Sequence, residues 1–146
     1  MRYATFQKIG DNCFKVVFTG EKATKRNFQE YLDDLQYCHL DRKPVTILFD
    51  ATKAKVPALN LQRKQADWMS INRIMIEKYC LGTAYVIDKP AIRLVLELIF
   101  SFYNQPAPFK IFKCDPLQLS HRIQQRNVYM LETVDGFPWF MWRKPK

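Results

Sequence analysis

The chain has 146 residues, of which 48% are hydrophobic, so it has the length of one domain and can bury a substantial core. It carries 23 basic and 14 acidic residues, and the resulting net charge of +9 is spread along the chain, which does not indicate specific nucleic-acid binding. The chain has no run of about 18 apolar residues, the length that a membrane-spanning helix needs. Met1–Gly10 lacks the apolar centre of a signal peptide. We therefore expect a cytoplasmic protein with a single domain over residues 1–146.

Two strands are expected first. Tyr3–Ile9 alternates aromatic and polar residues, and Cys13–Thr19 is rich in valine and phenylalanine. The turn-forming residues 10–12 separate them, so we expect an antiparallel hairpin.

A helix is predicted next, from Thr24, whose hydroxyl can cap its N-terminus, to about Leu40. Apolar residues recur along one side of it at helical spacing and indicate the face that packs on the core. They are Phe28, Tyr31, Leu32, Leu35 and Cys38.

Val45–Phe49 and Thr83–Ile87 are short, continuous apolar runs, typical of parallel strands that are buried on both faces. We expect them to be neighbours at the centre of the sheet. Between them a helix is predicted over about Leu61–Tyr79, with Asn60 as its N-cap.

Pro90 suits the first turn of a further helix, Ala91–Tyr103, which is apolar nearly all round. Its polar pair, Arg93 and Glu97, has i, i+4 spacing. Because one sheet face cannot cover this helix completely, either it is buried within the core or its outer face pairs with another subunit.

The last elements expected are a strand at Phe109–Lys113 and a helix from Asp115 to about Leu131. Residues 132–146 form an aromatic tail, which packs on its own domain, fills a partner's groove or touches an anionic membrane surface. Of these we do not expect membrane contact. The tail and the apolar helix together predict a homodimer.

This order of elements predicts an α/β fold: a mixed, mainly parallel sheet with an N-terminal hairpin and flanking helices. Four segments, with this order, resemble the SpoIIAA-like proteins of the STAS superfamily, and the resemblance covers about residues 3–125. It implies a STAS fold and a regulatory or protein-interaction role without catalysis. Some of these proteins are described as similar to CRAL-TRIO lipid carriers, which implies the alternative of a carrier or binding protein for a small apolar or anionic ligand. The four segments are ILFDATKA (47–54), LQRKQADWM (61–69), LGTAYVID (81–88) and AIRLVLELIFSFYNQPAPFKIF (91–112).

The chain departs from the family at the turn before the second helix. Anti-sigma-factor antagonists of the superfamily carry an Asp-Ser-Ser-Gly-type turn there, with a serine that a kinase phosphorylates. The corresponding turn, Val56–Asn60, has neither serine nor threonine, and the nearest hydroxyls belong to Thr52 and Ser70. We therefore expect no serine phosphoswitch at this turn.

Neither a catalytic nor a metal site is predicted. The chain has no G-x-S-x-G motif, its four glycines cannot form a phosphate-binding loop, and its cysteines and histidines lack the close pairs of a zinc site. No cofactor is expected, and the thiols are expected to be reduced and mostly buried. The residues concerned are Cys13, Cys38, Cys80, Cys114, His39 and His121.

A ligand site is predicted beyond the carboxyl ends of the central strands, where open α/β sheets bind their ligands. Arg63 and Lys64 are expected in the first turn of the second helix, whose free N–H groups favour an anion. The alternative is a solvated basic loop. Asp50 and Asp88 either form a two-carboxylate enzyme site or cap the segments that follow them. The candidate binding residues are Asp50, Thr52, Lys53, Lys55, Asn60, Arg63 and Asp88.

Overall fold

The computed structural model describes residues 1–9, 13–102, 107 and 109–112. Cys114, the helix expected from Asp115 and the aromatic tail 132–146 lie outside the described residues. Within them the chain forms five strands and four helices. In chain order these are β1 (Ala4–Lys8), β2 (Cys13–Phe18), α1 (Lys25–Tyr37), β3 (Val45–Asp50), α2 (Leu59–Ile71), α3 (Arg73–Tyr79), β4 (Cys80–Val86), α4 (Pro90–Phe102) and β5 (Phe109–Phe112).

The strands form one mixed sheet in the order β1-β2-β3-β4-β5. The hairpin β1–β2 is antiparallel, and β2 to β5 are parallel to one another. The predicted α/β fold with two central parallel neighbours is therefore confirmed, since β3 and β4 contain the two apolar runs.

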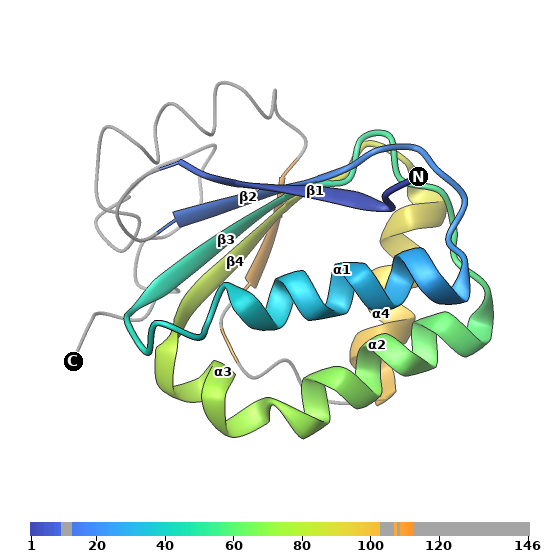
Figure 1. Ribbon diagram of the computed structural model, residues 1–146. Helices are drawn as coiled ribbons and strands as arrows, with labels where there is room; N and C mark the ends of the chain where they lie inside the picture. Colours follow the sequence, from blue (N-terminus) through green and yellow to red (C-terminus); the bar gives the residue numbers. More distant parts are fainter. Residues whose placement is uncertain (10–12, 103–106, 108, 113–146) are drawn as a thin grey trace.

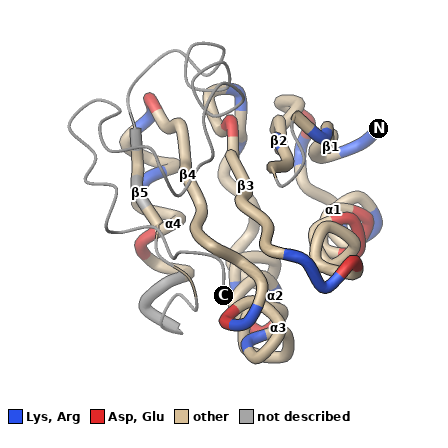
Figure 2. The backbone as a smooth tube through the Cα atoms, turned by 90° about the vertical axis from the view of Figure 1, so that its left-hand side faces the viewer, with Lys and Arg blue, Asp and Glu red and all other residues tan. Residues whose placement is uncertain are grey.

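The four helices lie on one face of this sheet (Figures 1 and 2). Each parallel connection steps to the next strand in the same direction across the sheet. Since such connections are nearly always right-handed, repeated steps in one direction put every connecting helix on the same side. The described helices thus flank the sheet on one side only, and none of them is long and apolar enough to cross a membrane.

The core centres on β3. Ile47 and Phe49 point toward the helices and belong to one buried cluster with residues of α1. Thr46 and Leu48 alternate with them, point to the opposite face and are fully buried as well. This burial on both faces explains why the run has no polar alternation.

Helix α1 has the predicted cap and the predicted buried face. The Thr24 hydroxyl accepts a hydrogen bond from the Asn27 backbone N–H (3.1 Å), and the Asn27 side chain accepts one from the Thr24 N–H (2.7 Å). This reciprocal pair satisfies two otherwise free donors. All five residues of the predicted apolar face are buried: Phe28, Tyr31, Leu32, Leu35 and Cys38.

The helix predicted over Leu61–Tyr79 is wrong in its start and its continuity. It begins at Leu59, because the Ala58 carbonyl already accepts from the backbone N–H groups of residues 61 and 62, so Asn60 is its second residue and not its cap. Ala58 has no side-chain cap bond.

The same helix is interrupted at Asn72, whose side chain donates to the Trp68 carbonyl (2.9 Å), and continues as α3. Strand β4 then begins at Cys80, three residues before the predicted start. Gly82 lies inside β4, next to a shift in its register with β3.

Helix α4 begins at Pro90, as predicted, and its Arg93 and Glu97 side chains form an ion pair at 3.5 Å. Ile92 and Ile99 are buried, whereas Leu94 is 65% exposed. The helix is therefore not fully enclosed by the domain, and the outer part of its apolar surface is open in the single chain.

Candidate functional site

At the carboxyl edge of the sheet, Asp50 forms a local turn. Its Oδ1 accepts hydrogen bonds from the Thr52 backbone N–H (3.1 Å) and hydroxyl (2.7 Å). Asp88 follows β4 and is exposed. In the described part of the chain no hydrogen bond or ion pair joins the two carboxylates. This geometry agrees with a capping role for Asp50.

The other candidates at this edge, Lys53, Lys55, Asn60 and Arg63, are exposed, and Figure 2 shows charged segments where β3 and β4 end. Arg63 is the fifth residue of α2 and therefore lies in its second turn, not in the first as predicted, because the helix begins two residues earlier. This weakens the argument for an anion held by free N–H groups beside Arg63, since only the first N–H groups of a helix lack partners.

A different site lies deeper, in a cavity of about 110 Å³ between the sheet and the helices. All four helices contribute to its walls. The lining includes Cys80, Thr83 and Tyr85 of β4 and Ile87 just after it. The lining is mostly apolar. Cavities of about 150 Å³ lined by apolar side chains bind benzene, so this one has room for a group approaching one ring in size.

Aromatic rings form one wall of the cavity. Phe49 stacks on Tyr85 with 4.7 Å between the ring centroids and 6° between the planes, and on its other side lies Phe18 at 6.2 Å. These three side chains come from adjacent strands and all line the cavity. They form a row across β2, β3 and β4, which we call the aromatic row.

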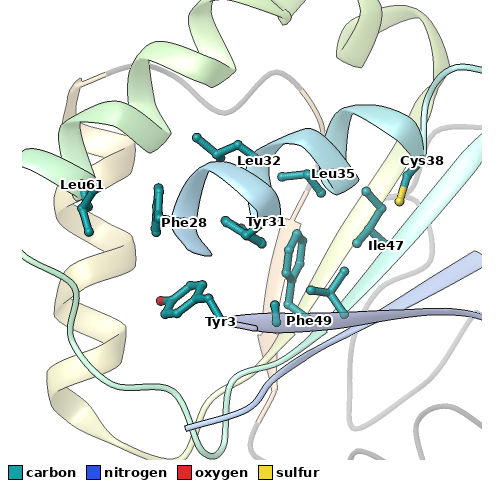
Figure 3. Close-up of a cluster of buried hydrophobic side chains, with 11 residues drawn as sticks. Tyr3, Phe28, Tyr31, Leu32, Leu35, Cys38, Ile47, Phe49 and Leu61 are labelled. Carbon is teal, nitrogen blue, oxygen red and sulfur yellow. The ribbon is translucent and has the colours of Figure 1, made fainter. Parts of the chain in front are cut away.

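A second aromatic group closes the space between α1 and the hairpin. Tyr3, Phe28 and Tyr31 contact one another with centroid distances of 5.4 to 5.6 Å. Figure 3 shows them between α1 and the sheet, near Phe49. Ring contacts of this kind add stability beyond the apolar area that they bury.

His39 lines the cavity just beyond the end of α1 and is only 2% exposed. Its Nδ1 lies 3.0 Å from the Leu35 carbonyl oxygen. Because a carbonyl only accepts, Nδ1 carries the hydrogen and Nε2 is an acceptor. Burial lowers the pKa of His39 below 6.5, although the Leu35 hydrogen bond raises it, so the ring is neutral at pH 7.

Two buried ring nitrogens of residues that line the cavity have no hydrogen-bond partner among the described residues: His39 Nε2 and Trp68 Nε1. Trp68 packs against Ile76 and Cys80, where β4 begins. In Figure 1 the end of α1, helix α3 and the starts of β3 and β4 lie together at the left of the molecule. Since His39 follows α1, it lies toward the amino end of the cavity, where the strands begin.

The opposite end of the cavity reaches the predicted site. Ala51, Ala54, Lys55 and Pro57, which follow β3, line it there, together with Ile87 after β4. Lys55 is the only one of the seven candidate residues that lines the cavity. The structure thus connects the carboxyl edge to an apolar interior that was not predicted.

The described cysteines have buried thiols of low reactivity. Cys13, Cys38 and Cys80 are free and buried, and burial raises the pKa of Cys13 and Cys38 to about 12. Cys13 and Cys38 are therefore protonated at neutral pH, whereas thiolates are the nucleophiles and metal ligands. Within the described ranges no three histidine, cysteine or acidic side chains gather closely enough to hold a metal ion.

His39 was overlooked as a site residue, although its position carries a signal. Phe28, Leu32, Leu35 and His39 follow one another at intervals of four, three and four residues, so His39 continues the buried face of α1. Trp68 has no comparable signal, because its role depends on how α2 and α3 pack on β4.

Comparison with models of protein families, with curated proteins and with solved structures finds no match for this chain. The resemblance to STAS proteins therefore stays a prediction, and the function of the site is inferred from its geometry.

Proposed function

We propose that this chain is a non-enzymatic, STAS-like regulatory domain that binds a small apolar molecule between its sheet and its helices. The observation that carries the proposal is the cavity, whose walls are mostly aromatic and aliphatic. Burying apolar surface contributes about 25 cal/mol per Å², so a ring-sized ligand inside such walls gains free energy without any charged contact. The proposal combines the regulatory role with the alternative of a protein that binds a small apolar ligand, both of which the sequence suggests.

The size of the cavity limits the ligand. Sites for drug-sized molecules have volumes of about 300–1,000 Å³, whereas this cavity has about 110 Å³. A bulky lipid of the kind held by large carriers does not fit this volume. The proposal is therefore a small molecule, with one ring or a short chain.

The proposal is tested with benzene as the probe, in NMR titrations of the full chain. Ala54→Leu adds three carbon atoms to a residue that lines the cavity, and we expect it to weaken benzene binding at least tenfold. Ala91→Leu makes the same change at an exposed position of α4 and should leave the affinity unaltered. If wild-type protein does not bind benzene, the proposal is wrong.

A second candidate function is self-association or a protein contact through the outer face of the helices. Leu94 on α4 and Ile74 on α3 are 65% and 81% exposed, and a contiguous apolar patch that includes such side chains would favour association. The test is sedimentation: we expect a dimer that Leu94→Asp dissociates. A wild-type monomer at high micromolar concentration would rule it out.

A further inference from the structure

The cavity reaches solvent beside Lys55. Of the described residues that line it, Lys55 alone is exposed, and all the others are buried or half-buried. Its neighbours in the loop after β3, Ala54 and Pro57, also line the cavity and are buried. The mouth of the cavity therefore lies at Lys55, at the carboxyl edge of the sheet.

Lys55 also brings a full charge to an otherwise uncharged lining. Among the described residues no aspartate, glutamate or arginine lines the cavity, and His39 is neutral at pH 7. The carboxylates of the same edge leave Lys55 unpaired: in this part of the chain Asp50 accepts hydrogen bonds from Thr52, and no ion pair joins Lys55 to Asp50 or Asp88. A cation at the mouth of an apolar cavity suits a ligand with an apolar body and an anionic end, since a few polar groups orient ligands in apolar sites.

The aromatic row lies at this end of the cavity. Phe18 and Tyr85, its outer members, pack against the buried cluster that includes Ala54. Ala54 directly precedes Lys55 in the chain. A flat ring that enters at Lys55 therefore meets aromatic side chains, with which rings pack favourably.

Resting on the proposed function, we infer that the ligand is a small apolar carboxylate, such as an aromatic acid with one ring. Its apolar body occupies the cavity of about 110 Å³ against the aromatic row, and its carboxylate stays at the mouth, where the Lys55 ammonium pairs with it. The flexible four-carbon stem of lysine lets the ammonium follow the carboxylate. Because both charges stay in contact with water, binding avoids the cost of burying a charge in an apolar interior.

Benzoate and benzamide test this inference, because they have the same number of non-hydrogen atoms and differ in charge. In NMR titrations of the full chain we expect benzoate to bind about fivefold more tightly, which corresponds to the upper part of the range for exposed ion pairs. Lys55→Gln removes the charge and should bring this ratio to about one. Lys89→Gln removes an exposed lysine that follows β4 at the same edge but does not line the cavity, so the ratio should stay near that of the wild type.

The ratio is measured on one protein at a time, so a general weakening of the site in a variant cancels. Salt supplies a second measurement on the wild-type chain that needs no variant to fold. In 1 M NaCl the exposed pair is screened, so the ratio should fall toward one, whereas the affinity for benzene should not fall.

The outcomes are distinct. If benzoate binds no more tightly than benzamide, or if salt leaves the ratio unchanged, the inference is wrong, and the proposed apolar site survives as long as benzene binds. If Lys89→Gln lowers the ratio as much as Lys55→Gln, the basic edge attracts anions in general and the inference is again wrong. If benzene, benzoate and benzamide all fail to bind, the proposed function fails and the inference with it.

Discussion

The region around α1 and the region formed by α2, α3 and α4 cover the same sheet face in different ways. Helix α1 has a capping box, and its whole apolar face is buried. Helix α2 begins at Leu59, and its N-cap residue, Ala58, makes no side-chain cap bond. Ile71, Ile74 and Leu94 of the second region are mostly exposed. The first region therefore stabilises the fold through its buried face, whereas the second region leaves apolar side chains exposed for other contacts.

The largest expected effect contrasts one leucine from each region. Leu32→Ala removes a side chain that is 2% exposed and should lower the free energy of unfolding by about 2–5 kcal/mol. Leu94→Ala, at 65% exposure, should change it by less than about 0.5 kcal/mol. Urea unfolding measures both. Equal losses would mean that the two regions are equally packed.

The helix caps give a second contrast between the two regions. Thr24→Ala should cost about 1 kcal/mol, because it leaves the Asn27 backbone N–H without its acceptor. Ala58 has extended dihedral angles (φ −61°, ψ 154°) that suit a capping side chain, so Ala58→Asp should stabilise the protein by about 0.5 kcal/mol or more. Thermal unfolding of the two variants should therefore move the midpoint in opposite directions, and a gain from Thr24→Ala would contradict this account.

His39, which follows α1 and lines the cavity, should make stability depend on pH. Its pKa in the folded protein is below 6.5, the value expected in the unfolded chain, so the unfolded chain binds the proton first as the pH falls. The stabilisation is complete well above pH 6.5 and is lost as the pH falls toward the lowered pKa. Near pH 6.5 the slope can be at most about 0.7 kcal/mol per pH unit, the limit in which the unfolded chain binds half a proton and the folded chain binds none.

Chemical denaturation between pH 7.5 and pH 5.5 measures this dependence. His39→Phe should flatten it. A slope that is the same in wild-type and variant protein would assign the effect to other groups.

The smallest effect concerns the surface of α4. Arg93 and Glu97 are 50% and 57% exposed at the side chain, and solvent screens such a pair. A double-mutant cycle to alanine should give a coupling of about 0.3–0.5 kcal/mol, which 1 M NaCl reduces. A coupling above 1 kcal/mol would show that the outer face of α4 is more enclosed than its exposure suggests.

Sequence patterns predicted the elements that bury a regular face. Helix α1 and the two central strands were found because their apolar residues repeat at one period or form an uninterrupted run. The break at Asn72 was missed, because an asparagine side chain that bonds to a carbonyl four residues back leaves no trace in the apolar pattern.

Of the cavity, sequence reasoning predicted only the part at the carboxyl ends of the strands. The candidates at the carboxyl ends of the strands follow from the rule for open sheets, and one of them, Lys55, does line the cavity. The cavity itself depends on how closely four helices approach five strands. Side-chain volumes and helix positions decide this, and neither follows from the spacing of residues along the chain.

The strand order has a consequence for how the chain folds. Because every strand pairs with the strand before it in the sequence, the sheet can grow one strand at a time as the ribosome releases the chain. The aromatic row would assemble in the same order. The cavity, by contrast, gains its last described helical wall only when α4 docks, so a ligand could be enclosed at the final stage of folding, and the timing of synthesis would then decide what the interior holds.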